Sequence, residues 1–459
     1  MRPNILDTTR RASEMIVLFT GLLCMMLAQC ADDTETDGIE IMNPTARISD
    51  DISTVIIVEW KTDIATTGRV EFGEGNDFSY STPMETTPTD THRALLIGMP
   101  SETDVRYRIV ASDGESEIVS TPQTIATGDL PSYLPDLVAE GTGPDGFTIV
   151  PIIATDRAVV TIIDAKGRIV WYHSDDRDLD IYRARLSRDK QSILYNAASV
   201  SGSPSEDSEL MRISLDGASI TAIPVPLLAH DFVALDDGTI GAIVAEYRSV
   251  NDAQVMGNQI VEVSTDGTVL PVWSTWDCFD PETDVGDTTD NGWTFANALD
   301  YDPAEDVYYI GFMNFSSIAK VDRTSGRCLW VFGSTAETMT FEENAPRFWH
   351  QHQFQVLENG ILIFDNDGAP GTESRVTEYA FDFDTNTASE VWSYTAQPSV
   401  FSFVLGEPIR LDNGNTLINW SASGQMNLVT SDGDSIYQLN LPMGNVFGFN
   451  TLETSLYQL

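Results

Sequence analysis

Two histidines open apolar segments in the same way, and they are the residues best placed to do chemistry. His230 begins the run His230-Asp231-Phe232, and His352 begins the run His352-Gln353-Phe354. Each histidine precedes the glycine of the next turn by the same spacing, Gly238 in one case and Gly360 in the other. The chain has only 5 histidines, so the occurrence of two of them at the same register position indicates equivalent places in the fold. We predict that both side chains point towards a common axis.

The remaining histidines raise the question of a metal site. His350 lies two residues before His352, and the alternation of a strand predicts that the two share a face. His92 and His173 stand in unrelated contexts and are predicted to be surface residues. Three imidazoles would suffice for a catalytic zinc ion. However, no further segment supplies a ligand in register, and an i, i+2 pair on a strand fits a tetrahedral ion poorly, so no metal is predicted.

A repeated pattern provides the elements that position these residues. An apolar run, a turn with Gly or Asp, and a second apolar run occur six times, and each copy predicts a β-hairpin. Two hairpins in each ~50-residue period are typical of a four-stranded propeller blade. We therefore predict an all-β fold with a six-bladed β-propeller over residues 137–459; a solenoid is the alternative. The copies are 160–171, 210–220, 260–273, 318–330, 376–392 and 427–439.

Residues 40–128 lack this repeat and predict a separate domain. Short apolar runs alternate there with turn residues at close spacing, which is typical of a small β-sandwich. The segment resembles a fibronectin type III-like or Ig-like module, with Trp60 in the core and Tyr107 as the corner tyrosine. We interpret it as a spacer that packs on the propeller; adhesion or substrate guidance is the alternative. Pro131 and Pro135 mark the linker, since proline cannot extend a strand.

The charge balance excludes one class of partner. The chain carries 70 acidic and 25 basic residues, for a formal net charge of −45. Nucleic-acid binding needs clustered Lys and Arg, so nucleic acid is not predicted as a partner. The charge is interpreted as a solvated acidic surface, and calcium binding by the Asp-rich segment 277–290 is the alternative.

The first 30 residues predict export. Arg2, Arg10 and Arg11 precede an apolar run over 15–27, which is shorter than the ~20 residues of a membrane span. Cys30 at the end of this segment resembles the lipid-accepting cysteine of bacterial lipoproteins, which implies a periplasmic or outer-membrane-anchored protein. Residues 31–39 are rich in Asp, Thr and Glu and are interpreted as a disordered tether.

Cys278 and Cys328 are the two cysteines outside this signal segment. A disulfide between them is compatible with an oxidising compartment, but their spacing does not decide whether it forms.

Further residues around His352 carry a family resemblance. The stretch from Gln351 through Asp365-Asn366 to Ser374-Arg375 is similar to the corresponding segment of the bacterial arylsulfate sulfotransferases, which have a β-sandwich before a six-bladed propeller. The resemblance implies that His352 attacks an aryl sulfate and carries the sulfuryl group to a phenol, without a cofactor. It further implies that His230 is a second active-site histidine and Asn297 a substrate contact. Neutral imidazole is a suitable nucleophile near pH 7, and a second imidazole suits proton transfer.

Two positions depart from the family's pattern. Phe295 stands where the resemblance implies a third active-site histidine, and Met313 stands where it implies an arginine. Loss of one donor to a developing oxyanion costs ~10²–10³ in rate, so a substitute is needed. His350, Arg347 and Arg375 are the candidates. For Arg375, a structural bond to a neighbouring carboxylate is the alternative.

Two other functions compete with sulfuryl transfer. A catalytically degenerate propeller would be a binding or scaffold module of the cell envelope, which does not need His352. A quinoprotein-like propeller is suggested by residues 321–330, which resemble a tryptophan-docking turn, but six blades and the lack of a quinone site count against it. Oligomeric state is not predicted.

Overall fold

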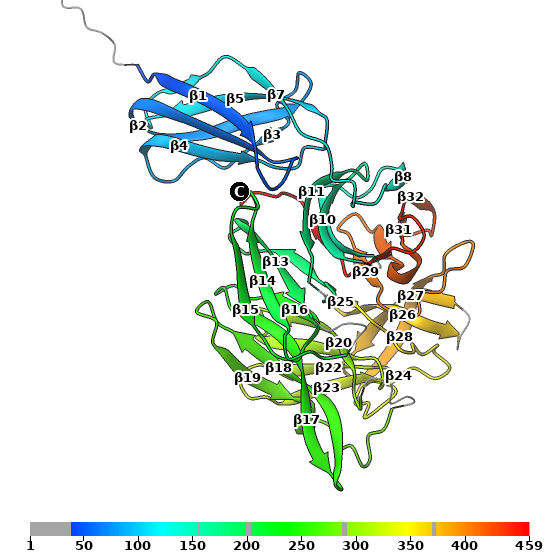
Figure 1. The fold of residues 1–459 in the computed structure, drawn as a ribbon. Coiled ribbons are helices and arrows are strands. Elements are labelled where there is room, and N and C mark those ends of the chain that lie inside the picture. Colours follow the sequence, from blue (N-terminus) through cyan, green and yellow to red (C-terminus); the bar gives the residue numbers. More distant parts are fainter. Residues whose placement is uncertain are drawn as a thin grey trace, which may run out of the picture. The chain divides into compact units, whose positions relative to one another are not determined.

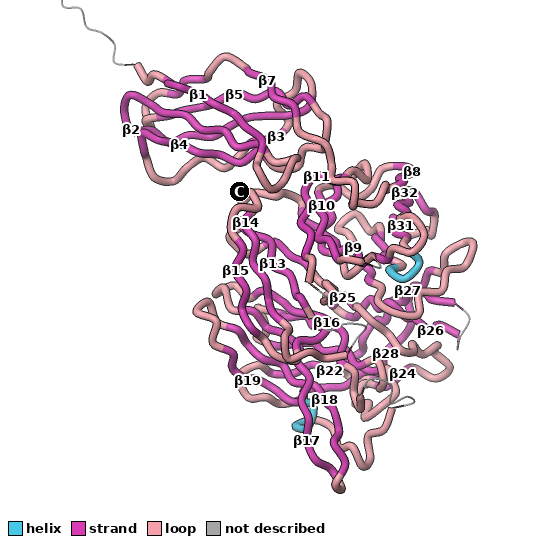
Figure 2. The backbone as a smooth tube through the Cα atoms, viewed as in Figure 1, coloured by secondary structure: helices cyan, strands magenta, loops and turns pink. Residues whose placement is uncertain are grey.

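The computed structural model contains strands and two short 3-10 turns, Thr275–Asp277 and Ser421–Ser423, over the part of the chain that it describes (Figures 1 and 2). That part comprises residues 38–154, 156–177, 179–198, 203–286, 292–369 and 373–458. Within these ranges no helix is long and apolar enough to cross a membrane. The predicted signal segment, Cys30 and most of the predicted tether lie outside the described residues.

The N-terminal domain is a curled seven-stranded sheet with the character of a β-sandwich. The long strand β2 belongs to both halves: its first part pairs with β1 and β4, and its second part pairs with β3 and β5. Trp60 and Tyr107 are buried in the core, and the Tyr107 hydroxyl donates to Gln123 Oε1 at 2.8 Å. The strands are β1 Ile41–Ile48, β2 Ile56–Glu74, β3 Tyr80–Ser81, β4 Thr89–Leu96, β5 Asp104–Ser112, β6 Glu117–Val119 and β7 Gln123–Ala126.

The prediction of a six-bladed propeller is confirmed. Six sheets follow the sandwich, and in each of them one predicted hairpin forms two adjacent strands on the outer side of the blade. The first three blades, in order from the inner strand, contain β33 Val446–Phe447 and β34 Thr451–Glu453 with β9 Phe147–Ile153, β10 Ala158–Asp164 and β11 Ile169–Asp175; β12 Ala184–Leu186, β13 Ser192–Ala197, β14 Glu209–Ser214 and β15 Ile220–Pro224; and β16 Leu228–Ala234, β17 Ile240–Val250, β18 Ala253–Val263 and β19 Val269–Ser274.

The other three blades have the same order. They contain β20 Ala296–Asp302, β21 Val307–Phe312, β22 Ser317–Asp322 and β23 Cys328–Gly333; β25 Phe354–Leu357, β26 Gly360–Ala369, β27 Glu373–Asp382, β28 Thr387–Tyr394 and the short β24 Thr340–Phe341; and β29 Glu407–Arg410, β30 Thr416–Asn419, β31 Gln425–Val429, β32 Ser435–Asn440 and β8 Val138–Gly141.

Strands from both ends of the propeller sequence close the ring. The C-terminal strands β33 and β34 pair with β9 and supply the inner edge of the first blade. At the other closure, β8 pairs with β32 and adds an outer strand to the last blade. The two closures leave fewer unpaired strand edges and join residues that are far apart in sequence. Neither closure was predicted.

The sandwich contacts the propeller through apolar and polar side chains. Ile52, Val55 and Ile97 belong to the same buried cluster as Trp171 of β11. Tyr457, which follows β34, donates from its hydroxyl to the carbonyl of Leu95 at 2.9 Å. The contact agrees with the interpretation of the sandwich as a spacer that packs on the propeller.

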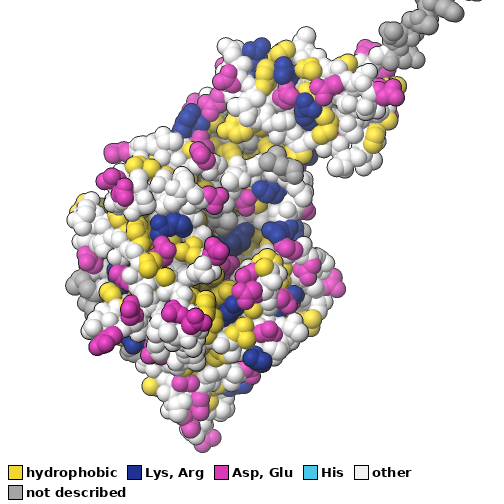
Figure 3. All heavy atoms as spheres, turned by 180° about the vertical axis from the view of Figure 1, so that it is seen from behind, with side chains coloured by type: hydrophobic (Ala, Val, Ile, Leu, Met, Phe, Trp, Pro, Cys, Tyr) yellow, Lys and Arg dark blue, Asp and Glu magenta, His cyan; other side chains and the backbone are white. Residues whose placement is uncertain are grey.

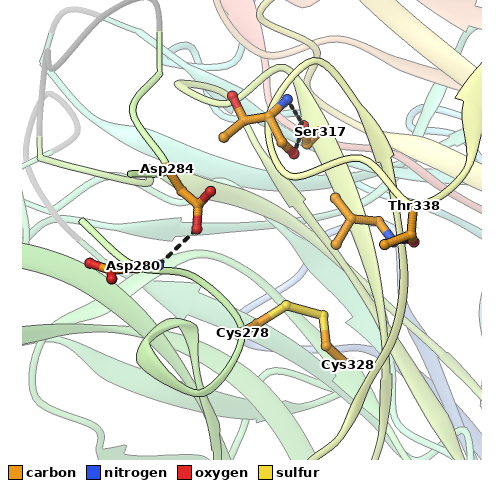
Figure 4. Close-up of a disulfide and its surroundings, with 8 residues drawn as sticks. Cys278, Asp280, Asp284, Ser317, Cys328 and Thr338 are labelled. Carbon is orange, nitrogen blue, oxygen red and sulfur yellow. Dashed lines mark hydrogen bonds between the residues drawn. A yellow bond between two sulfur atoms is a disulfide. The ribbon is translucent and has the colours of Figure 1, made fainter. Parts of the chain in front are cut away.

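A disulfide joins Cys278, just after the first 3-10 turn, to Cys328 at the start of β23, with their Cα atoms 5.8 Å apart (Figure 4). Asp280 and Asp284 lie beside it, and the backbone N–H of Asp280 donates to the Asp284 carboxylate. The bond therefore ties the segment after the third blade to the outer strand of the fourth.

Acidic side chains are spread over the face of the molecule drawn in Figure 3, with basic side chains among them. This distribution fits the interpretation of the negative charge as a solvated surface.

Candidate functional site

The structure brings His230 and His352 together at the inner strands of two blades. His230 lies in β16, where the pairing with β17 shifts register between Leu228 and Phe232, and His352 lies just before β25. The side chains are buried, with 6% of His230 and 2% of His352 exposed. The imidazoles are near enough for charge on His230 to disfavour protonation of His352. The two histidines therefore form the candidate site.

Hydrogen bonding orients the His352 ring. Asn366, in β26, donates from Nδ2 to the carbonyls of Ser402 at 2.6 Å and Leu405 at 2.9 Å, and these two acceptors fix the orientation of the amide. Its Oδ1 consequently faces His352 Nδ1, at 2.9 Å. Since Oδ1 can only accept, Nδ1 of His352 carries the proton, and Nε2 of the neutral ring keeps its lone pair. This arrangement prepares Nε2 as a nucleophile.

Burial keeps both imidazoles neutral. Desolvation lowers the pKa of His352 to about 3; the hydrogen bond to Asn366 acts in the opposite direction and charge on His230 in the same one. Desolvation also lowers the pKa of His230 to about 4, although the charge of Asp231 acts in the opposite direction. A neutral ring has the free electron pair that a nucleophile or a general base needs.

Aromatic rings surround His230. Its ring centroid lies 4.9 Å from that of Tyr182 and 4.9 Å from that of Phe295, which approaches edge-on. Nδ1 of His230 has no hydrogen-bond partner among the described residues. An unpaired buried nitrogen is costly unless a ligand or water binds it, so it marks a place for one.

The prediction that His350 shares a strand face with His352 is wrong. Residues 350–353 lie outside β25, and His350 has a φ of +50°, so strand alternation does not apply. The backbone N–H of His350 donates to Ser316 Oγ at 3.0 Å, and its Nδ1 donates to Asp367 Oδ2 at 2.8 Å. His350 is therefore held by side chains on either side of the loop rather than by a strand.

Arg375 is bound to carboxylates. Its Nε donates to Asp365 Oδ2 at 2.8 Å and its Nη1 to Glu390 Oε2 at 2.7 Å, while Nη2 donates to the carbonyl of Arg347. Asp365 also accepts from the backbone N–H of Trp349. Arg375 and Asp365 together hold the segment that leads into His350 and His352, which corresponds to the structural alternative for this arginine.

Asn297 holds the backbone beside the nucleophile candidate. It is buried in β20, and its Nδ2 donates to the carbonyl of Gln351 at 2.8 Å. Its Oδ1 is buried and has no hydrogen-bond partner within the described part of the chain. Gln351 in turn donates to the carbonyls of Phe312 and Ser317. The fourth blade therefore positions the loop that carries His352.

The other two histidines lie outside this pair's surroundings. The prediction that His92 is a surface residue is wrong: it is 1% exposed, stacks on Trp60, and donates from Nδ1 to Glu85. His173 is half-buried, and its Nε2 lies 3.2 Å from the Tyr195 hydroxyl. In the described ranges, no three His, Cys, Asp or Glu residues are grouped so as to hold a metal ion.

A family comparison covers most of the propeller. Residues 138–442 match the family described as arylsulfotransferase (ASST), and the match covers well over half of the 459 residues. The chain belongs to the arylsulfotransferase family. Membership supports a sulfotransferase-like function for the propeller and is consistent with a divergent member.

Other comparisons concern the fold. Solved structures with a similar arrangement include a protein of unknown function from Bacteroides caccae (16% identity, TM-score 0.42, 65% of this chain and 94% of that chain). A streptogramin B lyase (12%, 0.38, 67% and 98%) and a putative 6-phosphogluconolactonase from Bacteroides fragilis (11%, 0.36, 83% and 98%) are also similar. Among curated proteins, no match was found.

Phe295 and Met313, the two positions where the sequence resemblance implies replaced donors, are neighbours in space. The backbone N–H of Met313 donates to the carbonyl of Phe295 at 3.0 Å, so the two positions lie on adjoining segments. Phe295 is buried against His230, and Met313 is half-buried. Apolar side chains therefore occupy the two positions where the family resemblance implies donors.

The inner segments of the propeller hold a buried ion network that was not predicted from the sequence. Arg183 is 1% exposed, and it donates to Asp231 Oδ1 and to both oxygens of Glu407, each at 2.9 Å. Asp231 also accepts from Gln353 Nε2 at 2.8 Å and from the backbone N–H of Leu299 at 3.0 Å. The network thereby joins five inner segments. A charged residue within the apolar run 181–186 was the available signal.

Asparagines in the second strands connect neighbouring blades. Asn196 of β13 donates to the carbonyls of Ala229 and His230, and Asn419 of β30 donates to the carbonyl of Gly448. Asn366 occupies the equivalent place in β26. The amide of Asn366 additionally orients the His352 ring.

Proposed function

We propose that the chain transfers a sulfuryl group from an aryl sulfate to a phenol through a sulfohistidine at His352. The observation that carries the proposal is the neutral His352 ring, whose Nδ1–H donates to Asn366 and whose Nε2 keeps a lone pair. Membership of the arylsulfotransferase family supports the same reaction class.

The first half-reaction forms one bond and breaks one. Nε2 of His352 attacks sulfur, an N–S bond forms, the S–O bond to the aryl group breaks, and that electron pair leaves on the phenolate. Burial opposes the protonation of His230 that a general acid needs, whereas the negative charge of an arriving aryl sulfate favours it. A nitrophenolate needs little protonation, so such a donor relies least on His230.

The second half-reaction frees His352, and His230 afterwards passes its added proton to the phenolate released in the first half-reaction or to water. His230 accepts the proton of the incoming phenol, the phenol oxygen attacks sulfur, and the N–S bond breaks with its electron pair returning to Nε2. The neutral form of His230 suits this role as a general base.

The covalent intermediate provides the direct test. Incubation of the purified chain with nitrophenyl sulfate should add the mass of one sulfuryl group, detectable by intact-mass spectrometry, and peptide mapping should place it on His352. A chain that releases nitrophenol without this adduct would contradict the covalent route.

The pH dependence should reflect the buried imidazoles. We expect kcat/KM for nitrophenyl sulfate to stay constant from pH 7 to about pH 5, because pKa values of about 3 and 4 keep His352 and His230 neutral there. Below the pKa of His352, Nε2 is protonated and cannot attack sulfur. An exposed histidine would instead lose activity near pH 6.5. A pH–rate profile, with folding checked by circular dichroism at each pH, distinguishes the two cases.

Met313→Arg should raise activity by about tenfold or more, because it supplies a cation where the sulfuryl oxygens gain charge. Arg183 and Arg375 are each bound to two carboxylates, so neither offers this charge freely. Met313→Gln, which has similar length and no charge, is the matched control. An equal rate for both variants would show that charge at this position does not limit the reaction.

The competing proposal is a catalytically degenerate propeller that acts as a binding or scaffold module. The observation in its favour is the apolar pair Phe295 and Met313, together with the burial of both imidazoles. If the propeller is only a binding or scaffold module, the wild-type protein and the Met313→Arg variant should both be inert towards a panel of aryl sulfates.

Export and anchoring through Cys30 form a separate proposal. Its support is the basic start, the apolar run and the cysteine at its end. Labelling of cells with a fatty-acid analogue tests it, and an unlabelled mature chain would remove the anchor.

A further inference from the structure

Residues of the inner strands of the propeller line an open cavity whose lining includes neither His230 nor His352. It has a volume of about 220 Å³, and five of the six blades contribute inner-strand residues to it. Its polar wall includes Arg185, Asp300 and Asn450, and its apolar wall includes Phe354 and Ile409.

The cavity lies beyond the buried ion network. Arg185 follows Arg183 by two residues in the same inner segment, and Asp300 follows Leu299, whose backbone donates to Asp231. Glu407 of the network of Arg183, Asp231 and Glu407 also lines the cavity, whereas neither His230 nor His352 is among its lining residues.

Arg185 presents unused donors to this cavity. Its Nε donates to the carbonyl of Phe232 at 3.1 Å, while Nη2 lies 3.9 Å from Asp231 Oδ1, beyond hydrogen-bonding distance. Among the described residues, neither terminal nitrogen makes a hydrogen bond. Burial lowers the pKa of Arg185, and the charge of Arg183 lowers it further. The planar group is thus available for a carboxylate.

Asp300 presents an unused acceptor to the same cavity. Its Oδ1 accepts from the backbone N–H of Tyr301 at 2.9 Å, and in the described ranges no ion pair within 4.0 Å joins it to Arg185. Burial raises the pKa of Asp300, as expected for a carboxylate without a close cation. The cavity wall therefore holds one positive and one negative group that do not neutralise each other directly.

Asn450 adds a third polar feature. It is 1% exposed, and both its side-chain nitrogen and its side-chain oxygen are buried without a hydrogen-bond partner among the residues that the structure describes. An amide with a free donor and a free acceptor can assist either end of a polar ligand, with a small shift of its side chain.

We propose that this cavity binds a small zwitterion of the α-amino-acid type, with its carboxylate on Arg185 and its ammonium group on Asp300. A simple anion would meet the carboxylates of Glu407 and Asp300, and a simple cation would meet Arg185. A zwitterion satisfies both charges, and the walls formed by Phe354 and Ile409 suit a small apolar side chain.

L-alanine is the probe, and two fragments of it are the controls. Propionate lacks the ammonium group, and ethylammonium lacks the carboxylate. Calorimetric titration of the mature full chain should detect L-alanine binding, with each fragment at least tenfold weaker. Equal binding of either fragment, or no binding of L-alanine, would overturn the proposal.

Variants locate the binding. Arg185→Gln and the nearly isosteric Asp300→Asn should each weaken L-alanine binding at least tenfold, whereas Arg188→Gln, at an arginine on the surface, should leave it unchanged. His352→Ala should also leave it unchanged, so failure of the sulfuryl-transfer proposal and failure of this one are distinguishable. If Arg185→Gln does not fold, Asp300→Asn alone decides. Unaltered binding in a folded Asp300→Asn variant would place the ligand elsewhere.

Discussion

His352→Ala is expected to abolish the sulfuryl adduct and to lower kcat/KM by on the order of 10⁴-fold or more, because no other group takes over the attack on sulfur. The nucleophile candidate is nearly closed to solvent, and its ring orientation depends on one amide. Intact-mass spectrometry and initial rates with nitrophenyl sulfate measure the two effects. An adduct that persists in His352→Ala would assign the nucleophile to another residue.

His230→Ala separates proton transfer from attack. We expect it to slow turnover by ~10²–10⁴-fold with a phenol of high pKa as leaving group, and by much less with nitrophenol. The adduct should still form from the nitrophenyl donor. Equal losses for both leaving groups would instead indicate that His230 only shapes the site.

Asn366→Ala tests the orientation of the ring, with Asn419→Ala as its matched control. Both asparagines lie in the second strand of a blade and donate to a carbonyl of the next inner segment, but only Asn366 contacts a histidine. Both variants should lose stability, and only Asn366→Ala should also lower kcat of the folded protein. If the two variants have equal kcat, the amide of Asn366 is only structural.

The propeller was predictable from the sequence because its hairpins are local. Each pair of outer strands is joined by a short turn with Gly or Asp, so periodicity alone locates them. The ring closures gave no such signal: β33 has two residues, and its partner β9 lies about three hundred residues earlier in the chain. Pairing between distant, short segments leaves no local pattern.

The site was predictable only in part, for reasons that particular residues make plain. His230 and His352 were found because two blades repeat one register. His350 was misplaced because strand alternation was extended to a segment with a left-handed residue. His92 was misplaced because a buried histidine looks like an exposed one in sequence until its partners, Glu85 and Trp60, are known. Arg183 was missed because its carboxylates come from other blades.

Arg183→Met is expected to destabilise the protein by about 3–5 kcal/mol, because it leaves Asp231 and Glu407 buried without their cation. Arg183 is 1% exposed and also donates to the carbonyl of Asn450, so one side chain joins three inner segments. Urea unfolding of the variant measures the loss. Arg188→Met is the matched control: this arginine pairs with Asp236 on the surface, where a salt bridge contributes below ~1 kcal/mol.

The same variant has a characteristic pH dependence. Although burial opposes ionisation of Asp231, the charges of Arg183 and Arg185 keep its pKa below the ordinary value, whereas burial raises the pKa of Glu407. Without Arg183, the folded-state pKa values of both carboxyl groups should lie above their unfolded values. Protonation then favours the folded state, so the loss of unfolding free energy in Arg183→Met should be largest near pH 7 and shrink towards pH 5.

Adding Asp231→Asn and Glu407→Gln to this variant should recover part of the lost stability at pH 7, because neutral amides remove the buried negative charge. If Arg183→Met costs no more than Arg188→Met and shows no pH dependence, the network does not stabilise the ring.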